Sequence, residues 1–173
     1  MVGLHEACQS VASGVCSSAI VAGSSIILTP TMTTAMSENM VLSPDGECRT
    51  FDADANGFAR AEAINAVYIK RLDHALRDGD PIRAVIRSTM INSNGKTTKM
   101  AKPSVEMQED LIRKAYKHAG IADIARTGLF EAHGTGTQAG DAVEAEAIAR
   151  AFRGKGVHIG AVCAGLGRVE NKD

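Results

Sequence analysis

The stretch Glu131-Ala132-His133-Gly134-Thr135-Gly136-Thr137 places a histidine between a strand-like run and a polar, glycine-rich turn. The preceding residues 127–130 predict a short buried strand, and Asp141 is expected to be the N-cap of a helix that continues through Phe152. His133 is therefore expected at the carboxyl end of a strand, the edge of an α/β sheet that usually faces a ligand.

Two interpretations of His133 remain open from this stretch alone. The imidazole is either a structural side chain satisfied within its own loop or a catalytic group. A phosphate-binding loop is disfavoured, because the turn is not followed by the Lys-Ser/Thr pair that ends a nucleotide-binding loop.

Composition limits the classes of protein to which the chain can belong. Its 173 residues have the length of one ordinary domain, and 45% apolar residues can support a core. A net charge of -1 gives no global attraction to nucleic acid or an anionic membrane, and the locally basic stretch 70–102 is interpreted as a solvated face. Without a signal sequence or a membrane-length apolar run, a cytoplasmic protein is expected.

The four cysteines do not form a recognisable framework. Cys8, Cys16, Cys48 and Cys163 lack the paired spacing of a metal site and the density of a secreted disulfide scaffold. We expect reduced thiols and no metal site.

Periodicity and turn residues predict an α/β fold with little internal repetition. The clearest helix is expected to start at Ser104, because acidic residues follow it, basic residues come late and Gly120 lies beyond its end. The other expected elements are a helix at 2–13, a strand at 19–28 buried on both faces, a long loop at 29–57, strands at 58–72 and 82–91 separated by a helical turn at 73–77, and strands at 127–131 and 157–162 flanking the helix 141–152.

Several motif-like runs follow one another in a fixed order along the chain. They are LSPDG at 42–46, TFD at 50–52, NGFARAE at 56–62, KRL at 70–72 continuing to ALRDGDPI at 75–82, and the histidine stretch 131–137 followed by GD at 140–141. Together they make the chain resemble the β-ketoacyl synthase domain of polyketide and fatty-acid synthases over nearly its whole length. Residues 61–70 and 92–97 are most similar to fungal reducing-type polyketide synthases.

The resemblance implies an α/β, thiolase-like fold of two similar halves, of which this chain holds a part. Residues 1–173 would form a single partial ketosynthase domain, with 1–81 the end of the amino-terminal half and 82–173 the start of the carboxyl-terminal half. Where sheet faces lack their usual cover, we expect the isolated chain to be poorly soluble or to need a partner, either a second copy in a homodimer or an intact synthase.

The family joins carbons by decarboxylative Claisen condensation, with a cysteine thiolate that takes an acyl chain from phosphopantetheine on an acyl carrier protein. On this resemblance His133 is the first catalytic histidine and hydrogen-bonds the malonyl thioester. Thr135 and Thr137 would bind the pantetheine arm, while Glu131 and Asp141 orient the loop. The resemblance implies no directly bound cofactor, and it implies malonyl and acyl thioesters as substrates.

Two departures from the family pattern bear on activity. The family's Thr-Ala-Cys-Ser-Ser elbow would fall upstream of Met1, and Cys8 is no substitute because about eleven helical residues would displace it roughly 16 Å. In the final family run, aligned with 160–168, Cys163 replaces a lysine and Arg168 replaces the second histidine. Either in-register decay or a shifted reading frame near residue 163 accounts for this change.

The sequence thus supports three functional hypotheses. The first is a truncated ketosynthase of a polyketide synthase with little activity of its own. The second is a non-enzymatic fragment that associates with an intact synthase or an acyl carrier. The third is an independent hydrolase or acyltransferase built around His133 and one cysteine.

Overall fold

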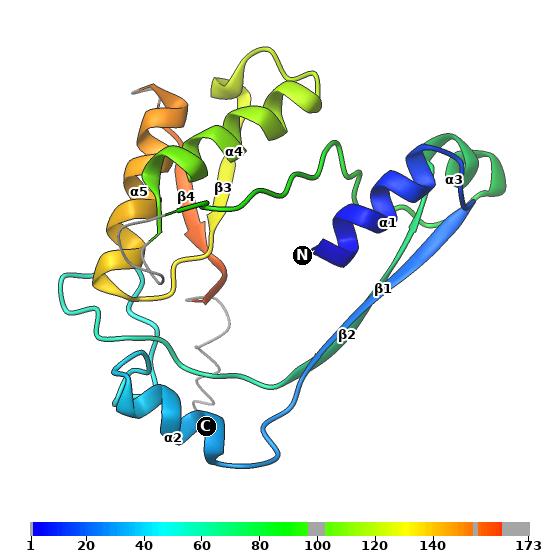
Figure 1. Ribbon diagram of the computed structural model, residues 1–173. Helices are drawn as coiled ribbons and strands as arrows, with labels where there is room; N and C mark the ends of the chain where they lie inside the picture. Colours follow the sequence, from blue (N-terminus) through cyan, green and yellow to red (C-terminus); the bar gives the residue numbers. More distant parts are fainter. Residues whose placement is uncertain (1, 97–102, 154–155, 164–173) are drawn as a thin grey trace, which may run out of the picture.

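The computed structural model describes residues 2–96, 103–153 and 156–163. Figure 1 shows two groups of elements, a long two-stranded ribbon with helices at one end and a second group in which two helices lie beside a short sheet. The elements run in the order α1 (Val2–Ala12), β1 (Ser18–Ser25), α2 (Thr31–Glu38), β2 (Ala63–Lys70), α3 (Leu72–Asp78), α4 (Val105–His118), the 3-10 turn η1 (Ile124–Arg126), β3 (Leu129–Ala132), α5 (Gln138–Phe152) and β4 (His158–Ala161).

The first group is built on an antiparallel ribbon of β1 and β2, paired from Ser18↔Lys70 to Ser25↔Ala63. Helix α1 lies against this ribbon (Figure 1) and approaches it at Gly3, where an added Cβ would sit 3.9 Å from Cγ1 of Val21. The prediction that residues 19–28 are buried on both faces is wrong, because Ile20 is 73% exposed. A single helix covers only one face of a ribbon.

Two predictions for the segment between the paired strands need correction. The expected loop 29–57 contains helix α2, whose first turn is tied by the Thr34 amide and hydroxyl donating to the carbonyl of Pro30. The strand expected at 58–72 is shorter and begins at Ala63. Residue Phe58 instead forms an isolated parallel bridge with Leu42.

The strand predicted at 82–91 is absent from the described part of the chain. The segment pairs with no strand in the described residues, and alternation alone does not make a strand without a neighbour. Side chains hold it instead, since Thr89 Oγ1 lies 2.9 Å from Nδ1 of His5 and Nη2 of Arg87 donates to the carbonyl of Ala119 at 2.9 Å.

The second group contains the described hydrophobic core. Helix α4 begins as predicted, with Oγ of Ser104 accepting from the Met107 amide at 3.2 Å, and it packs against α5 over the parallel pair β3 and β4. The ring of Phe152 lies edge-on to those of Tyr116 and Phe130, with centroids 6.1 and 5.9 Å apart. The buried cluster consists of Ala132, Ile148, Ala151 and Phe152.

Helix α5 starts earlier than predicted, so Asp141 is not its N-cap. Thr137 has the extended conformation of the cap position, and the Asp141 amide already donates to its carbonyl at 2.9 Å. Gly140 lies within the first turn, where an added Cβ would meet Oγ1 of Thr137 at 2.5 Å. The glycine therefore permits close packing inside the helix rather than ending a loop.

We predict that Phe152→Ala destabilises the chain by about 3–5 kcal/mol, because Phe152 is 2% exposed and its removal leaves a cavity in the cluster. Urea unfolding followed by far-ultraviolet circular dichroism measures the change. The matched control is Leu28→Ala, at a side chain that is 85% exposed, and its effect should stay within about 0.5 kcal/mol. Equal unfolding curves for the two variants would show that the core lies elsewhere.

Candidate functional site

His133 directly follows strand β3, at the carboxyl end of the parallel pair β3 and β4. This confirms the position predicted from the sequence. The imidazole is exposed, and the His133 carbonyl accepts a hydrogen bond from the Cys163 amide at 3.4 Å. The backbone is thus anchored in a residue that is open to solvent.

Glu144, in the second turn of α5, holds the start of the histidine loop. Its Oε1 accepts from the His133 amide at 2.8 Å, and its Oε2 accepts from the Gly134 amide at 2.9 Å. Such charge-assisted bonds restrict both successive peptide groups. Sequence reasoning missed this residue, although its place one turn after Asp141 on the same helix face was the available signal.

Asp141 joins the histidine loop to a segment far away in sequence. Its Oδ1 accepts from the Gly136 amide at 3.1 Å, and its Oδ2 accepts from the Phe51 amide at 2.8 Å. The side chain is buried, at 5% exposure of the residue. Burial of a carboxylate requires such partners, so Asp141 orients the loop from inside the helix rather than by capping it.

The histidine loop and the loop of the NGFARAE run cross at two glycines. The Gly57 amide donates to the Gly136 carbonyl at 2.9 Å. At Gly136, which has φ +71°, an added Cβ would lie 2.9 Å from both the Arg49 amide nitrogen and the Gly57 carbonyl oxygen. Thr50 Oγ1 also donates to the carbonyl of Gly134. Motif runs about 80 residues apart in sequence therefore meet at one place.

The two threonines of the loop lie next to each other. Their Oγ1 atoms are 3.0 Å apart, and both residues are half-buried beside the start of α5. Glu131 is placed differently, because its carboxylate packs over Gly160 on β4, where an added Cβ would be 2.8 Å from Cδ. His133, Thr135 and Thr137 thus share one loop, while Glu131 contacts the neighbouring strand.

Cys8 and Cys163 lack the surroundings of an activated nucleophile. Burial raises the pKa of the Cys8 thiol within α1, and burial together with the neighbouring Cys48 raises the pKa of the Cys163 thiol. A raised pKa leaves less thiolate for attack. The Cys48 sulfur accepts from the Ala59 amide at 3.1 Å. Arg168 of the aligned final run lies outside the described residues.

Residues 2–96, 103–153 and 156–163 contain neither a metal-binding cluster nor a membrane-spanning helix. There, His, Cys, Asp and Glu side chains do not cluster in threes in a way that could hold a metal ion. Within the same ranges, helices are too short or too polar to cross a membrane.

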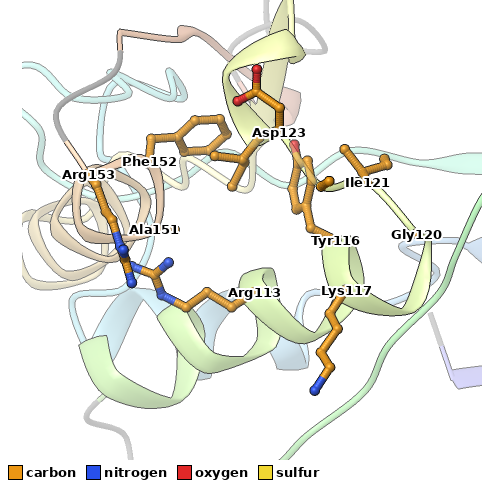
Figure 2. Close-up of a pocket in the computed structure, with 11 residues that line it drawn as sticks. Arg113, Tyr116, Lys117, Gly120, Ile121, Asp123, Ala151, Phe152 and Arg153 are labelled. Atoms are coloured by element: carbon orange, nitrogen blue, oxygen red, sulfur yellow. The ribbon is translucent and has the colours of Figure 1, made fainter.

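The chain also has an open hollow of about 630 Å³ between the ends of α4 and α5. Figure 2 shows Arg113 and Lys117 projecting from α4, with Tyr116 of α4 and Phe152 of α5 at its apolar side. Its lining includes Ile124, which precedes β3, whereas His133 follows β3. The hollow therefore belongs to the opposite end of the strand from the histidine loop.

Two family profiles match the chain in succession. The profile described as "Beta-ketoacyl synthase, N-terminal domain" matches residues 1–75, and "Beta-ketoacyl synthase, C-terminal domain" matches residues 83–171. The chain belongs to the β-ketoacyl synthase family. Fungal polyketide synthases and solved bacterial ketosynthases agree with this family assignment.

Curated relatives confirm the similarity to fungal reducing synthases. The chain is 54% identical over 170 residues to the highly reducing polyketide synthase sphB of Aspergillus fumigatus, covering 98% of this chain and 7% of the relative. It is 56% identical over 170 residues to the highly reducing polyketide synthase VdtX of Byssochlamys spectabilis, covering 98% and 8%. The chain thus spans less than a tenth of the length of these curated relatives.

Solved ketosynthase structures confirm the α/β, partial thiolase-like fold. The oxazolomycin ketosynthase domain of Streptomyces albus matches with a TM-score of 0.89 and 37% identity, over 95% of this chain and 29% of that one. A ketosynthase from module 6 of the bacillaene synthase of Bacillus subtilis matches with a TM-score of 0.86 and 39% identity, over 93% and 30%.

We predict that Glu144→Ala speeds hydrogen exchange of the His133 and Gly134 amides by about tenfold or more, because each loses a charge-assisted bond. Exchange measured by nuclear magnetic resonance tests this. Glu146→Ala is the control, since Glu146 is exposed and pairs with Arg150 on the same helix. Unchanged exchange in Glu144→Ala would show that the carboxylate does not hold the loop.

We predict that Gly136→Ala costs about 1–3 kcal/mol more than Gly46→Ala. Both glycines have φ +71°, but only at Gly136 does an added Cβ collide with backbone atoms. The pair therefore separates close packing from the shared strain of positive φ. Thermal unfolding of both variants measures the difference, and equal losses would exclude a tight crossing of the two loops.

Proposed function

We propose that this chain supplies the histidine loop of a polyketide synthase ketosynthase, which condenses acyl and malonyl thioesters. The observation that carries the proposal is the arrangement of His133: an exposed imidazole at the carboxyl end of β3, on a backbone held by Glu144. A fixed backbone in a residue open to solvent suits a group that must meet a substrate atom in one orientation.

In the proposed step His133 donates a hydrogen bond to the carbonyl oxygen of the malonyl thioester. The bond between the α-carbon and the carboxylate breaks, carbon dioxide leaves, and the electron pair delocalises onto that oxygen as an enolate. The enolate carbon then attacks an enzyme-bound acyl thioester and displaces its thiolate. A donor placed before the charge develops lowers the barrier most effectively.

Thr135 and Thr137 are proposed to bind the pantetheine arm that carries the malonyl group. Their hydroxyls are bonded to each other at 3.0 Å, next to the histidine in the same loop. Each hydroxyl can donate and accept, so the pair can exchange its mutual bond for bonds to the amides of the arm. The arm belongs to the phosphopantetheine of an acyl carrier protein or domain, which is the proposed partner.

We further propose that residues 1–81 and 82–173 belong to the two halves of the ketosynthase and that the chain acts with the rest of that domain. The raised pKa values of the Cys8 and Cys163 thiols support a nucleophile supplied from elsewhere in the domain. The same need for further chain, or for a second copy, supports assembly with an intact synthase or in a homodimer.

A chimera tests the role of His133. In it, residues 2–162 replace the matching segment of the Byssochlamys relative, to which the chain is 56% identical over 170 residues. The relative keeps its own final run, so Cys163 and Arg168 are not carried into the chimera. His133→Ala should reduce condensation about 10²–10³-fold, because one donor to the developing oxyanion is lost, while acyl loading onto the nucleophile stays intact. His158→Ala, at an exposed histidine on β4, is the control. Full condensation by His133→Ala would refute the proposed role.

A further inference from the structure

Two cysteines from distant parts of the sequence meet beside the histidine loop. The side chain of Cys163 hydrogen-bonds that of Cys48, and both residues are half-buried. Both thiols are free in the structure. The condensation step proposed for His133 uses neither of them, so their contact needs an explanation of its own.

The two cysteines belong to segments that meet at Gly134. An added Cβ at Gly134 would collide with Cγ2 of Thr50 and would lie 2.6 Å from Cβ of Ala161, so these two side chains converge on one point. Cys48 lies two residues before Thr50, and Cys163 lies two residues after Ala161. The approach of the two thiols is therefore part of the packing around the histidine loop.

Backbone hydrogen bonds hold each segment to the same stretch of that loop. Oγ1 of Thr50 donates to the carbonyl of Gly134, and the Cys163 amide donates to the carbonyl of His133 at 3.4 Å. Two successive peptide groups thus position the two segments independently of the thiols. The fold itself brings the sulfur atoms together, which is the main requirement for a disulfide.

The surroundings of the two thiols give them different roles. Burial and the neighbouring Cys48 raise the pKa of the Cys163 thiol, and the carboxylates of Asp141 and Glu144 add to this rise. Cys163 therefore keeps its proton and is the donor in the hydrogen bond between the two. The Cys48 sulfur is the acceptor, and it also accepts from the Ala59 amide at 3.1 Å. Cys48 is thus better placed to attack an oxidant, and Cys163 to react with the product.

We propose that Cys48 and Cys163 form a redox modification site, which hydrogen peroxide converts into a disulfide. The Cys48 sulfur attacks one peroxide oxygen, the O–O bond breaks, and hydroxide leaves with the thiol proton as water. The Cys163 sulfur then attacks the sulfur of the resulting sulfenic acid, the S–O bond breaks, and hydroxide leaves with the Cys163 proton as water. The two thiols lose two electrons in total, and the peroxide is reduced to two waters.

The disulfide would link the segment before Thr50 to the segment after β4, with Gly134 of the histidine loop between them. The free thiols of the structure are the reduced state of the pair, and thiol reductants would restore that state. The inference goes beyond the proposed condensation and does not rest on it, because it depends on the contact between two thiols and not on the role of His133.

The test treats the whole 173-residue chain with hydrogen peroxide and maps its disulfides by mass spectrometry of a digest made without reductant. We expect a Cys48–Cys163 peptide as the main product, the loss of two free thiols per chain, and their recovery with dithiothreitol. Oxidation in denaturing urea should lower the yield of this peptide at least about threefold, because four cysteines of an unfolded chain pair in several ways. The disulfide should also form in His133→Ala, which separates this inference from the catalytic proposal.

Cys163→Ser tests the order of the two steps. Dimedone, which traps sulfenic acids, should label Cys48 at least about tenfold more in Cys163→Ser than in the parent chain, because the second thiol is missing. Cys16→Ser removes a half-buried thiol outside the pair, so it is the matched control and should form the disulfide like the parent. Any of three results would overturn the inference: no Cys48–Cys163 disulfide in the parent, disulfides between separate chains instead, or equal yields with and without urea.

Discussion

Two carboxylates on α5 determine how the rest of the site is arranged. Glu144 accepts from the amides of His133 and Gly134, and Asp141 accepts from the amides of Gly136 and Phe51. These four backbone groups belong to a glycine-rich turn and to a distant loop, neither of which has a regular ladder of its own. Without the carboxylates the amides would lose their partners, and for the buried Gly136 amide an unpaired state is costly. Helix α5 thus holds the histidine loop that precedes it, and through Asp141 it also binds the loop that contains Phe51.

This constraint explains why the runs that carry the family resemblance are far apart in sequence but adjacent in the structure. An added Cβ at Gly136 would collide with the backbone of Arg49 and Gly57, and one at Gly57 would collide with the backbone of residues 41–43, so both partners of the Gly57–Gly136 hydrogen bond must be glycine. Some residues that make the chain resemble the family are therefore glycines that allow two backbones to come into contact, and not only chemically reactive groups. His133 is exposed and lies three residues before Gly136, so the hydrogen bonds of this crossing and of Glu144 fix the position of its backbone.

The sequence predicted the parts of the fold whose signals are local. The helix start at Ser104, the position of β3 and the place of His133 after it follow from side chains within a few residues. The strand expected at 82–91 and the burial expected at 19–28 depend on neighbouring elements, and within the described residues those neighbours are lacking. The Asp141 prediction was wrong in geometry because its partners, Gly136 and Phe51, include one that is 90 residues away. Glu144 was missed because its partners are backbone amides, which the sequence does not display.

The central claim is that the fastened loop presents His133 to a malonyl thioester. A crystal structure of the chimeric ketosynthase with a stable malonyl-thioester analogue bound to the pantetheine arm tests this most directly. The account predicts that a ring nitrogen of His133 lies within about 2.6–3.2 Å of the thioester carbonyl oxygen, with both carboxylate contacts of Glu144 preserved. An imidazole turned away from the bound analogue, with that oxygen hydrogen-bonded by other groups, would contradict it.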